Sequence, residues 1–139
     1  MCGIAGLWST EAIDQATLER LGRAMTAVLA HRGPDDNDVF VQADQGLCLG
    51  HVRLSILDLS PTGHQPMRSH SGRWEIVFNG EIYNHPELRR ELADRPWRGH
   101  SDTEVLLEAI ETFGPAGALE RATGMFAFAA WDRAQQQLW

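Results

Sequence analysis

The sequence of 139 residues is poor in positive charge and has no long apolar run. Its 12 Lys and Arg stand against 19 Asp and Glu, a formal net charge of −7, and no basic cluster offers a surface for nucleic acid or anionic lipid. The apolar runs are shorter than the roughly 18 residues of a membrane-spanning helix. No basic region precedes the apolar N-terminus, as it would in a secretory signal. We therefore expect neither nucleic acid nor a membrane among its partners.

Cysteine is scarce, and metal-binding spacings are missing. Cys2 and Cys48 could form one disulfide at most, which a chain of this length does not need. Cys48 lies in an apolar segment, which is typical of a small buried residue. The six histidines are scattered, without the spacing of a metal site. These absences favour a cytoplasmic protein with reduced thiols and no bound metal.

The residues that are present suit one globular domain, since 43% of them are hydrophobic and 22% are charged. Apolar residues at helical spacing predict a helix over 17–30 and another that begins at Ser101 and ends at Gly114-Pro115. Two pairs have the spacing of capping boxes at helix starts: Asn84 with Glu87, and Ser101 with Glu104.

Alternating or continuous apolar residues predict strands at five places: 3–8, 39–42, 46–57, 73–83 and 125–131. Residues 63–72 are predicted to form a loop, and the run at 125–131 suits a sheet that is covered on both faces. Within 73–83, Asn79-Gly80 is the pair typical of a type I′ hairpin turn, and local sequence favours that turn over a functional role. Mixed strands and helices favour layered sheets and helices over a regular βαβ succession.

The chain ends at Leu138-Trp139, which reads as the start of a further strand. Natural domains rarely stop there, so we expect the domain to be incomplete at its C-terminus. An unpaired strand edge would favour self-association, and a homodimer is one expectation.

Cys2 becomes the N-terminal residue if Met1 is removed, as is common before a small side chain. An α-amine with a pKa near 7.7–8.0 is partly neutral at pH 7, so it could accept the proton of the thiol on the same residue. The thiolate would then be a nucleophile. Taken alone, a cysteine at this position is more often only a small residue.

Other motifs change that interpretation. After MCGIAG at 1–6, the chain carries HRGPD at 31–35, GHVRLSI at 50–56, FNGEIYN at 78–84 and SDTE at 101–104. This ordered set resembles the glutaminase domain of class II glutamine amidotransferases, and RGPD, FNGEIYN and GMFAFAAWD are most similar to the asparagine synthetase branch. The resemblance covers essentially the whole chain. Val52, where many relatives carry a second arginine, departs from the pattern.

The resemblance implies that Cys2 attacks the side-chain amide of glutamine. It implies that Asn79 and Gly80 donate to the oxyanion, that Arg53 binds the α-carboxylate beside Leu54, and that Glu81 and Asp102 bind the α-ammonium. Each has a structural alternative: Arg53 could be a solvated strand residue, and Asp102 could serve the dipole of its helix. The loop HRGPDD would support the site without taking part in the chemistry.

The fold that the resemblance implies is α+β, a four-layer αββα N-terminal-nucleophile sandwich. Residues 1–139 would be the N-terminal part of a glutaminase domain. It would need no cofactor, whereas a synthetase domain, absent here, would use ATP and Mg. The partners implied are L-glutamine and that synthetase domain. Two alternatives stay open: an N-terminal-nucleophile amidase for another amide, and a non-catalytic module that binds glutamine or a protein.

Overall fold

The computed structural model describes residues 2–55 and 61–139, which form two antiparallel sheets packed face to face. The first sheet has the order β1-β3-β2, from strands β1 (Gly3–Trp8), β2 (Asp36–Gln42) and β3 (Leu47–Arg53). The second has the order β4-β5-β6-β7, from β4 (Met67–Arg68), β5 (Trp74–Ile82), β6 (Gly124–Asp132) and β7 (Gln137–Leu138).

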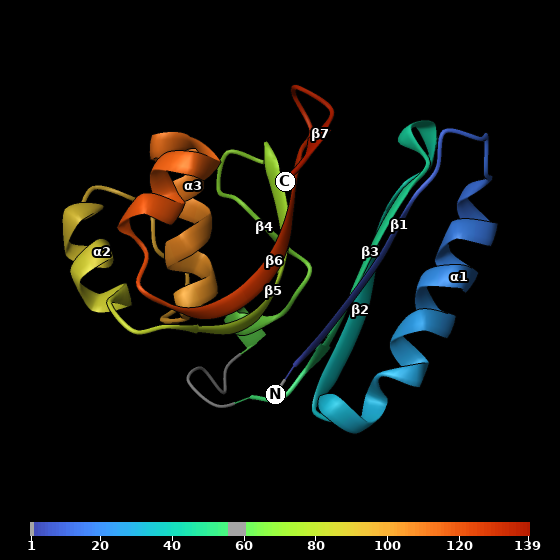
Figure 1. Cartoon of the computed structure of the whole chain (residues 1–139), viewed down its shortest axis with the longest axis horizontal. Helices are drawn as coiled ribbons and strands as arrows, with labels where there is room; N and C mark the ends of the chain where they lie inside the picture. The colour runs from blue at the N-terminus through green and yellow to red at the C-terminus, as the bar shows by residue number, and fades with distance from the viewer. Residues whose placement is uncertain (1, 56–60) are drawn as a thin grey trace.

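Helices cover the outer faces of both sheets (Figure 1). The helix α1 (Gln15–Val28) packs on the first sheet, and α2 (His85–Glu91) and α3 (Asp102–Arg121) lie on the second. Short 3₁₀ helices occupy Ala30–Arg32, Ala43–Gln45 and Pro61–Gly63. The layers therefore follow the order αββα, as predicted. Within 2–55 and 61–139, none of the helices has the length and apolar character to cross a membrane.

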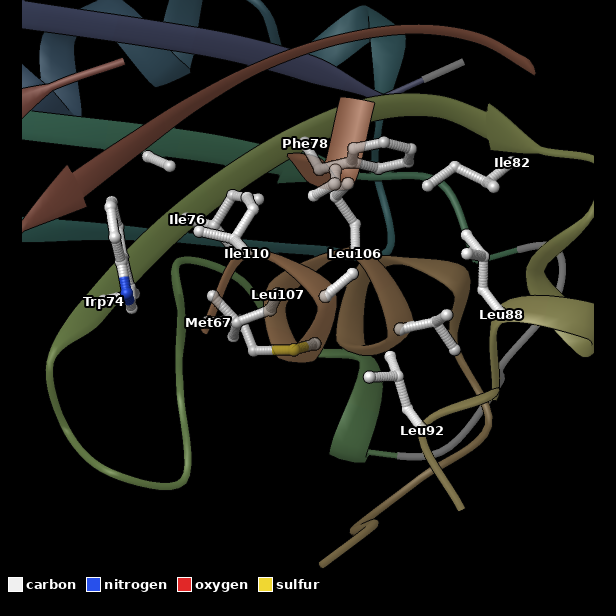
Figure 2. Packing of buried hydrophobic residues seen from close by; sticks show 14 residues of the cluster. Met67, Trp74, Ile76, Phe78, Ile82, Leu88, Leu92, Leu106, Leu107 and Ile110 are labelled. Carbon is white, nitrogen blue, oxygen red and sulfur yellow. The ribbon is translucent and has the colours of Figure 1, made fainter. Parts of the chain in front are cut away.

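The larger core lies between the second sheet and its two helices (Figure 2). Alternate residues of β5, including Ile76 and Phe78, point at Leu106 and Ile110 of α3, and all four are at most 3% exposed. A smaller cluster fills the space between the sheets: Leu47, Leu49, Val77 and Trp131. Because side chains alternate along a strand, Val77, Asn79 and Glu81 share the inner face of β5. By the same rule, Leu47, Leu49, His51 and Arg53 share the inner face of β3.

The Asn79-Gly80 pair lies in the middle of a strand, so the hairpin prediction is wrong. β5 is continuous from Trp74 to Ile82 and pairs along its whole length with β6, including Asn79 with Ala127 and Gly80 with Phe126. Nine backbone pairs and the apolar contact with α3 outweigh a local turn preference, because turn propensity is only a weak contribution when tertiary packing opposes it.

The helix caps follow the predictions in part. The Ser101 hydroxyl accepts from the Glu104 N–H at 3.2 Å, as in a capping box, but the Glu104 carboxylate accepts from the N–H groups of Arg98 and Gly99 instead of Ser101. Asn84 precedes α2, yet its side chain makes no cap; its amide bonds the Arg121 carbonyl and the Thr123 N–H. The Glu104 and Asn84 side chains are therefore occupied by partners outside the caps, which for Asn84 are distant in the sequence.

Four further features of the strands and helices differ from the predictions. β3 ends at Arg53, and residues 56–57 of the predicted strand lie outside the described residues. The short strand β4 interrupts the predicted loop 63–72. α3 breaks at Gly114, which has φ 74°, but a further helical segment follows to Arg121. β6 is buried on both faces only near Trp131, and Met125 at its start is 75% exposed.

Candidate active site

One cavity of about 290 Å³ lies where four elements meet: the start of β1, the end of β3, the middle of β5 and the start of α3. Its size is at the lower limit for small-molecule sites. The structure brings together around it all seven residues that the sequence predicts for the site: Cys2, Arg53, Leu54, Asn79, Gly80, Glu81 and Asp102. They come from positions up to 100 residues apart, and the two-sheet packing joins them.

Cys2 is held against the residue that follows β3. The Leu54 N–H donates to the Cys2 Sγ at 3.3 Å, and the Leu54 carbonyl lies 3.6 Å from the same sulfur. The Arg32 Nε–H donates to the Cys2 carbonyl at 3.0 Å, so the loop that contains HRGPDD supports this residue as predicted. An N–H donor beside the sulfur is placed to stabilise a thiolate.

Gly80 must be glycine because β5 and β6 approach closely there. Its φ is 152°, and a Cβ at this position would overlap the backbone of Met125 and Phe126. The neighbouring Asn79 points to the inner face, and its side-chain oxygen is buried without a hydrogen-bond partner among the described residues. The side-chain oxygen of Asn79 is therefore not committed to a structural contact among the described residues.

Arg53 is the last residue of β3 and is only 8% exposed. Its carbonyl accepts from the Asp35 N–H at 3.0 Å, and a Cβ on Gly63 would overlap its guanidinium. Burial on the cavity wall excludes the alternative of a solvated strand residue. A nearly buried guanidinium beside a cavity is suited to bind a carboxylate.

Two carboxylates also line the cavity, one on β5 and one at the start of α3. Glu81 lines the cavity from β5 and is exposed. Asp102, only 5% exposed, accepts from the Ile82 N–H at 3.0 Å and from the Thr103 N–H at 2.9 Å, so it joins α3 to β5 instead of only serving its own helix. Burial raises the pKa of Asp102, although these two hydrogen bonds oppose the rise. A bound cation would offset that burial cost.

Sequence reasoning missed several residues at this site. Gln65 is 5% exposed, lines the cavity, accepts from the Phe78 N–H at 2.7 Å and donates to the Thr103 hydroxyl at 3.2 Å. Tyr83 and Met125, both more than half exposed, also line it. A lone Gln in a predicted loop carries no pattern, so no local signal identifies Gln65.

His64 and His51 have shifted pKa values near this site. Burial lowers the pKa of His64, but hydrogen bonds to Asp36 and Asp38 outweigh it and raise the pKa above its usual range. Burial also lowers the pKa of the fully buried His51, to about 4, and there it dominates. Over residues 2–55 and 61–139, no group of three or more His, Cys, Asp or Glu is placed to hold a metal ion.

Comparison with known proteins gives one consistent family. A family model described as "Glutamine amidotransferase domain" matches residues 1–139. The sequence is 38% identical over 136 residues to asparagine synthetase [glutamine-hydrolyzing] 1 of Bacillus subtilis, covering 96% of this chain and 21% of that protein. It is 37% identical over 133 residues to asparagine synthetase B [glutamine-hydrolyzing] of Escherichia coli, covering 95% of this chain and 23% of the other.

Two further comparisons match an amidase in sequence and an amidotransferase in fold. The chain is 39% identical over 112 residues to amidase chry2 of Gibberella zeae, covering 80% of this chain and 16% of that protein. Its fold is similar to that of glutamine phosphoribosylpyrophosphate amidotransferase from B. subtilis, with a TM-score of 0.68 at 21% identity, over 93% of this chain and 35% of the other. The chain thus spans about a fifth of the length of the curated relatives it matches.

Proposed function

This chain belongs to the glutamine amidotransferase domain family, and from that premise we propose that its cavity hydrolyses glutamine to glutamate and ammonia. The observation that carries the proposal is the set of groups around one cavity: a thiol, an uncommitted amide, one cation and two carboxylates. These groups complement both ends of glutamine, since its α-carbon carries an ammonium and a carboxylate and its side chain ends in an amide.

The reacting groups would act as follows. With Met1 removed, the α-amine of Cys2 takes the thiol proton, and the thiolate attacks the side-chain carbonyl carbon of glutamine. The Asn79 amide and the Gly80 N–H donate to the oxygen that becomes negative. The protonated amine then gives its proton to the leaving nitrogen, ammonia departs, and a γ-glutamyl thioester remains. Water, deprotonated by the same amine, hydrolyses the thioester to glutamate and restores the thiol.

The substrate's other end would be held by charge. Arg53 binds the α-carboxylate, and Glu81 and Asp102 accept from the α-ammonium, with Leu54 forming the adjoining wall. Three charged contacts at one end of glutamine would place the amide at its other end against Cys2. The binding energy of these contacts would thus orient the amide for attack.

In the longer protein, the ammonia would supply ATP-dependent synthesis of asparagine from aspartate. Support comes from the glutamine-hydrolysing asparagine synthetases, which this chain matches over 95% or more of its length. A separate synthetase domain would be the partner and would bind ATP and Mg.

A second candidate is an amidase that acts on a different amide, and the identity to amidase chry2 favours it. Such an enzyme would use Cys2, Asn79 and Gly80 but would not require Arg53, Glu81 and Asp102. Substrates that lack one charge of glutamine separate the two functions.

The test follows ammonia release from matched amides by the chain without Met1, with Cys2→Ala as the blank. We expect glutamine to be hydrolysed at least a hundredfold more efficiently than glutaramate, which has the same amide without the α-ammonium. Equal efficiency on the two amides would support the general amidase. Calorimetric binding of glutamine with no turnover would leave only a binding module.

A further inference from the structure

On the edge of β5 away from β6, two side chains hold the backbone of Phe78 in place of a neighbouring strand. β4 pairs with β5 only at Arg68–Glu75 and Met67–Ile76, so this pairing stops before Phe78. The Phe78 N–H donates to the Gln65 Oε1 at 2.7 Å, and the Phe78 carbonyl lies 3.0 Å from the His51 Nε2. All three residues are at most 5% exposed.

These two contacts join the elements that carry the proposed catalytic and binding groups. His51 lies on β3, two residues before Arg53 and on the same face. Gln65 also donates to the hydroxyl of Thr103, which follows Asp102 in the first turn of α3. The backbone of Phe78 is thus linked through His51 to the strand with Arg53, and through Gln65 to the helix with Asp102.

Holding the Phe78 carbonyl adds to the pairing of Asn79 with Ala127 in fixing the position of Asn79. The Phe78 carbonyl and the Asn79 N–H belong to one planar peptide unit, so a fixed carbonyl fixes the orientation of that plane. Asn79 and Gly80 follow directly in the chain, and both residues line the cavity. Donors to a developing oxyanion must be placed in advance, because their benefit falls steeply when the geometry is wrong.

His51 is a donor here and not a proton carrier. It does not line the described cavity, and its depressed pKa keeps it neutral near pH 7. A neutral ring that donates from Nε2 to a carbonyl leaves Nδ1 unprotonated, and Nδ1 has no hydrogen-bond partner among the described residues. The ring is therefore committed to a single tautomer by the Phe78 carbonyl.

We propose that His51 and Gln65 are positioning residues: His51 holds the Phe78–Asn79 peptide and Gln65 holds the preceding Val77–Phe78 peptide. The Asn79 and Gly80 donors then meet the oxyanion while Arg53 and Asp102 hold the substrate. The proposal rests on the glutaminase function given above. It assigns His51 and Gln65 an effect on the rate of the chemical step and little effect on the binding of glutamine, because the oxyanion forms only in the reaction.

The test compares His51→Met with His51→Gln in the chain without Met1. A Gln amide reaches the place of the imidazole Nε2 and keeps a donor, whereas Met has a similar length and no donor. We expect His51→Met to lower kcat and kcat/KM together by about tenfold to a hundredfold, and His51→Gln to restore most of the loss. Gln65→Met should show the same signature, and it provides a second route if His51→Met does not fold.

A matched control is Leu47→Ala, which removes a fully buried side chain from the same face of β3 away from the cavity. It should lower the denaturant midpoint and leave kcat within about twofold of the parent value. An equal fall of kcat in Leu47→Ala would show that general loosening explains the result, and the proposal would be wrong.

Hydrogen exchange separates this proposal from the proposed function. In His51→Met the peptide that spans Phe78 to Glu81 should exchange its amide hydrogens at least tenfold faster, while Leu47→Ala leaves that peptide unchanged. Unaltered exchange in His51→Met overturns the positioning role whatever the activity. If His51→Met exchanges faster but the chain with His51 hydrolyses no glutamine, only the glutaminase function would be wrong.

Discussion

The N–H of Leu54 points at the sulfur of Cys2, 3.3 Å away, across 52 residues of sequence. The first strand and the end of β3 pair side by side, Gly3 with Val52, and this register brings the two residues together. The contact ties the proposed nucleophile to the backbone that also carries Arg53. The proposed nucleophile and the proposed carboxylate-binding cation are therefore placed by the same pair of strands.

Activity should require the removal of Met1. While Met1 is attached, the nitrogen of Cys2 is an amide and cannot accept the thiol proton, so both the base and the approach of substrate are lost. Preparations that retain Met1 should release glutamate as slowly as Cys2→Ala, several orders of magnitude below processed protein. Intact-mass spectrometry paired with glutamate release measures this. Equal rates with and without Met1 would show that the N-terminal amine is not the base.

Arg53→Ala should weaken glutamine binding at least tenfold. Removing one partner of a buried charged contact typically costs about 2–5 kcal/mol. Arg53→Lys should recover only part of the loss, because a lysine cannot make the two parallel hydrogen bonds of a guanidinium to a carboxylate. Calorimetry in a Cys2→Ala background gives the dissociation constant without turnover.

Arg73→Ala is the control for Arg53. It breaks the ion pair of Arg73 with Asp132 at 2.6 Å, which lies away from the cavity, and should leave the dissociation constant unchanged. If Arg73→Ala and Arg53→Ala weaken binding equally, Arg53 has no specific role in binding the carboxylate.

Gly80→Ala should destabilise the fold and abolish activity. The new Cβ would overlap the β6 backbone at Met125 and Phe126, and we expect a loss of about 3 kcal/mol or more in the free energy of unfolding. Gly72 also has a positive φ, 78°, but a Cβ there meets nothing within 4 Å. Gly72→Ala should therefore cost only about 1–2 kcal/mol from backbone strain and keep full activity. Urea unfolding of both variants measures the difference.

Stability should fall on acidification because of His51. Its pKa is about 4 in the folded chain and near 6.5 when unfolded, so between these values the unfolded chain binds the extra proton. The free energy of unfolding should thus decrease from pH 6.5 to pH 4 by up to about 3 kcal/mol from this residue. His51→Gln, which does not titrate, should show a flatter dependence in urea unfolding across this range. A parallel dependence in both proteins would contradict the buried neutral state.

His64 should act in the opposite direction at higher pH. Its carboxylate partners Asp36 and Asp38 raise the pKa of His64 in the folded chain. His64 therefore stabilises the fold at pH values below its unfolded pKa, and this stabilisation is lost as the pH rises through its folded pKa. His64→Gln should therefore remove a stability decrease that the parent chain shows above pH 6.5, measured by thermal melting at pH 6 and pH 8.

Local sequence was enough for most elements, whereas the candidate site residues followed from the resemblance of the whole ordered set of motifs. Helical spacing placed α1 within two residues of its limits, and Ser101 marked the start of α3. The seven site residues that the resemblance implied all line the cavity, where they supply a thiol, hydrogen-bond donors, a guanidinium and carboxylates. Those properties belong to side chains wherever the chain places them.

Tertiary structure decided the rest, because the deciding energies come from partners distant in the chain. Asn79-Gly80 satisfies a turn rule locally, but pairing with β6 and packing on α3 made it part of a strand. Asn84 could cap α2, but it bonds the chain after α3 instead. His51 and Gln65 meet at the backbone of Phe78 only after two sheets and a helix have packed, and burial then makes those hydrogen bonds obligatory.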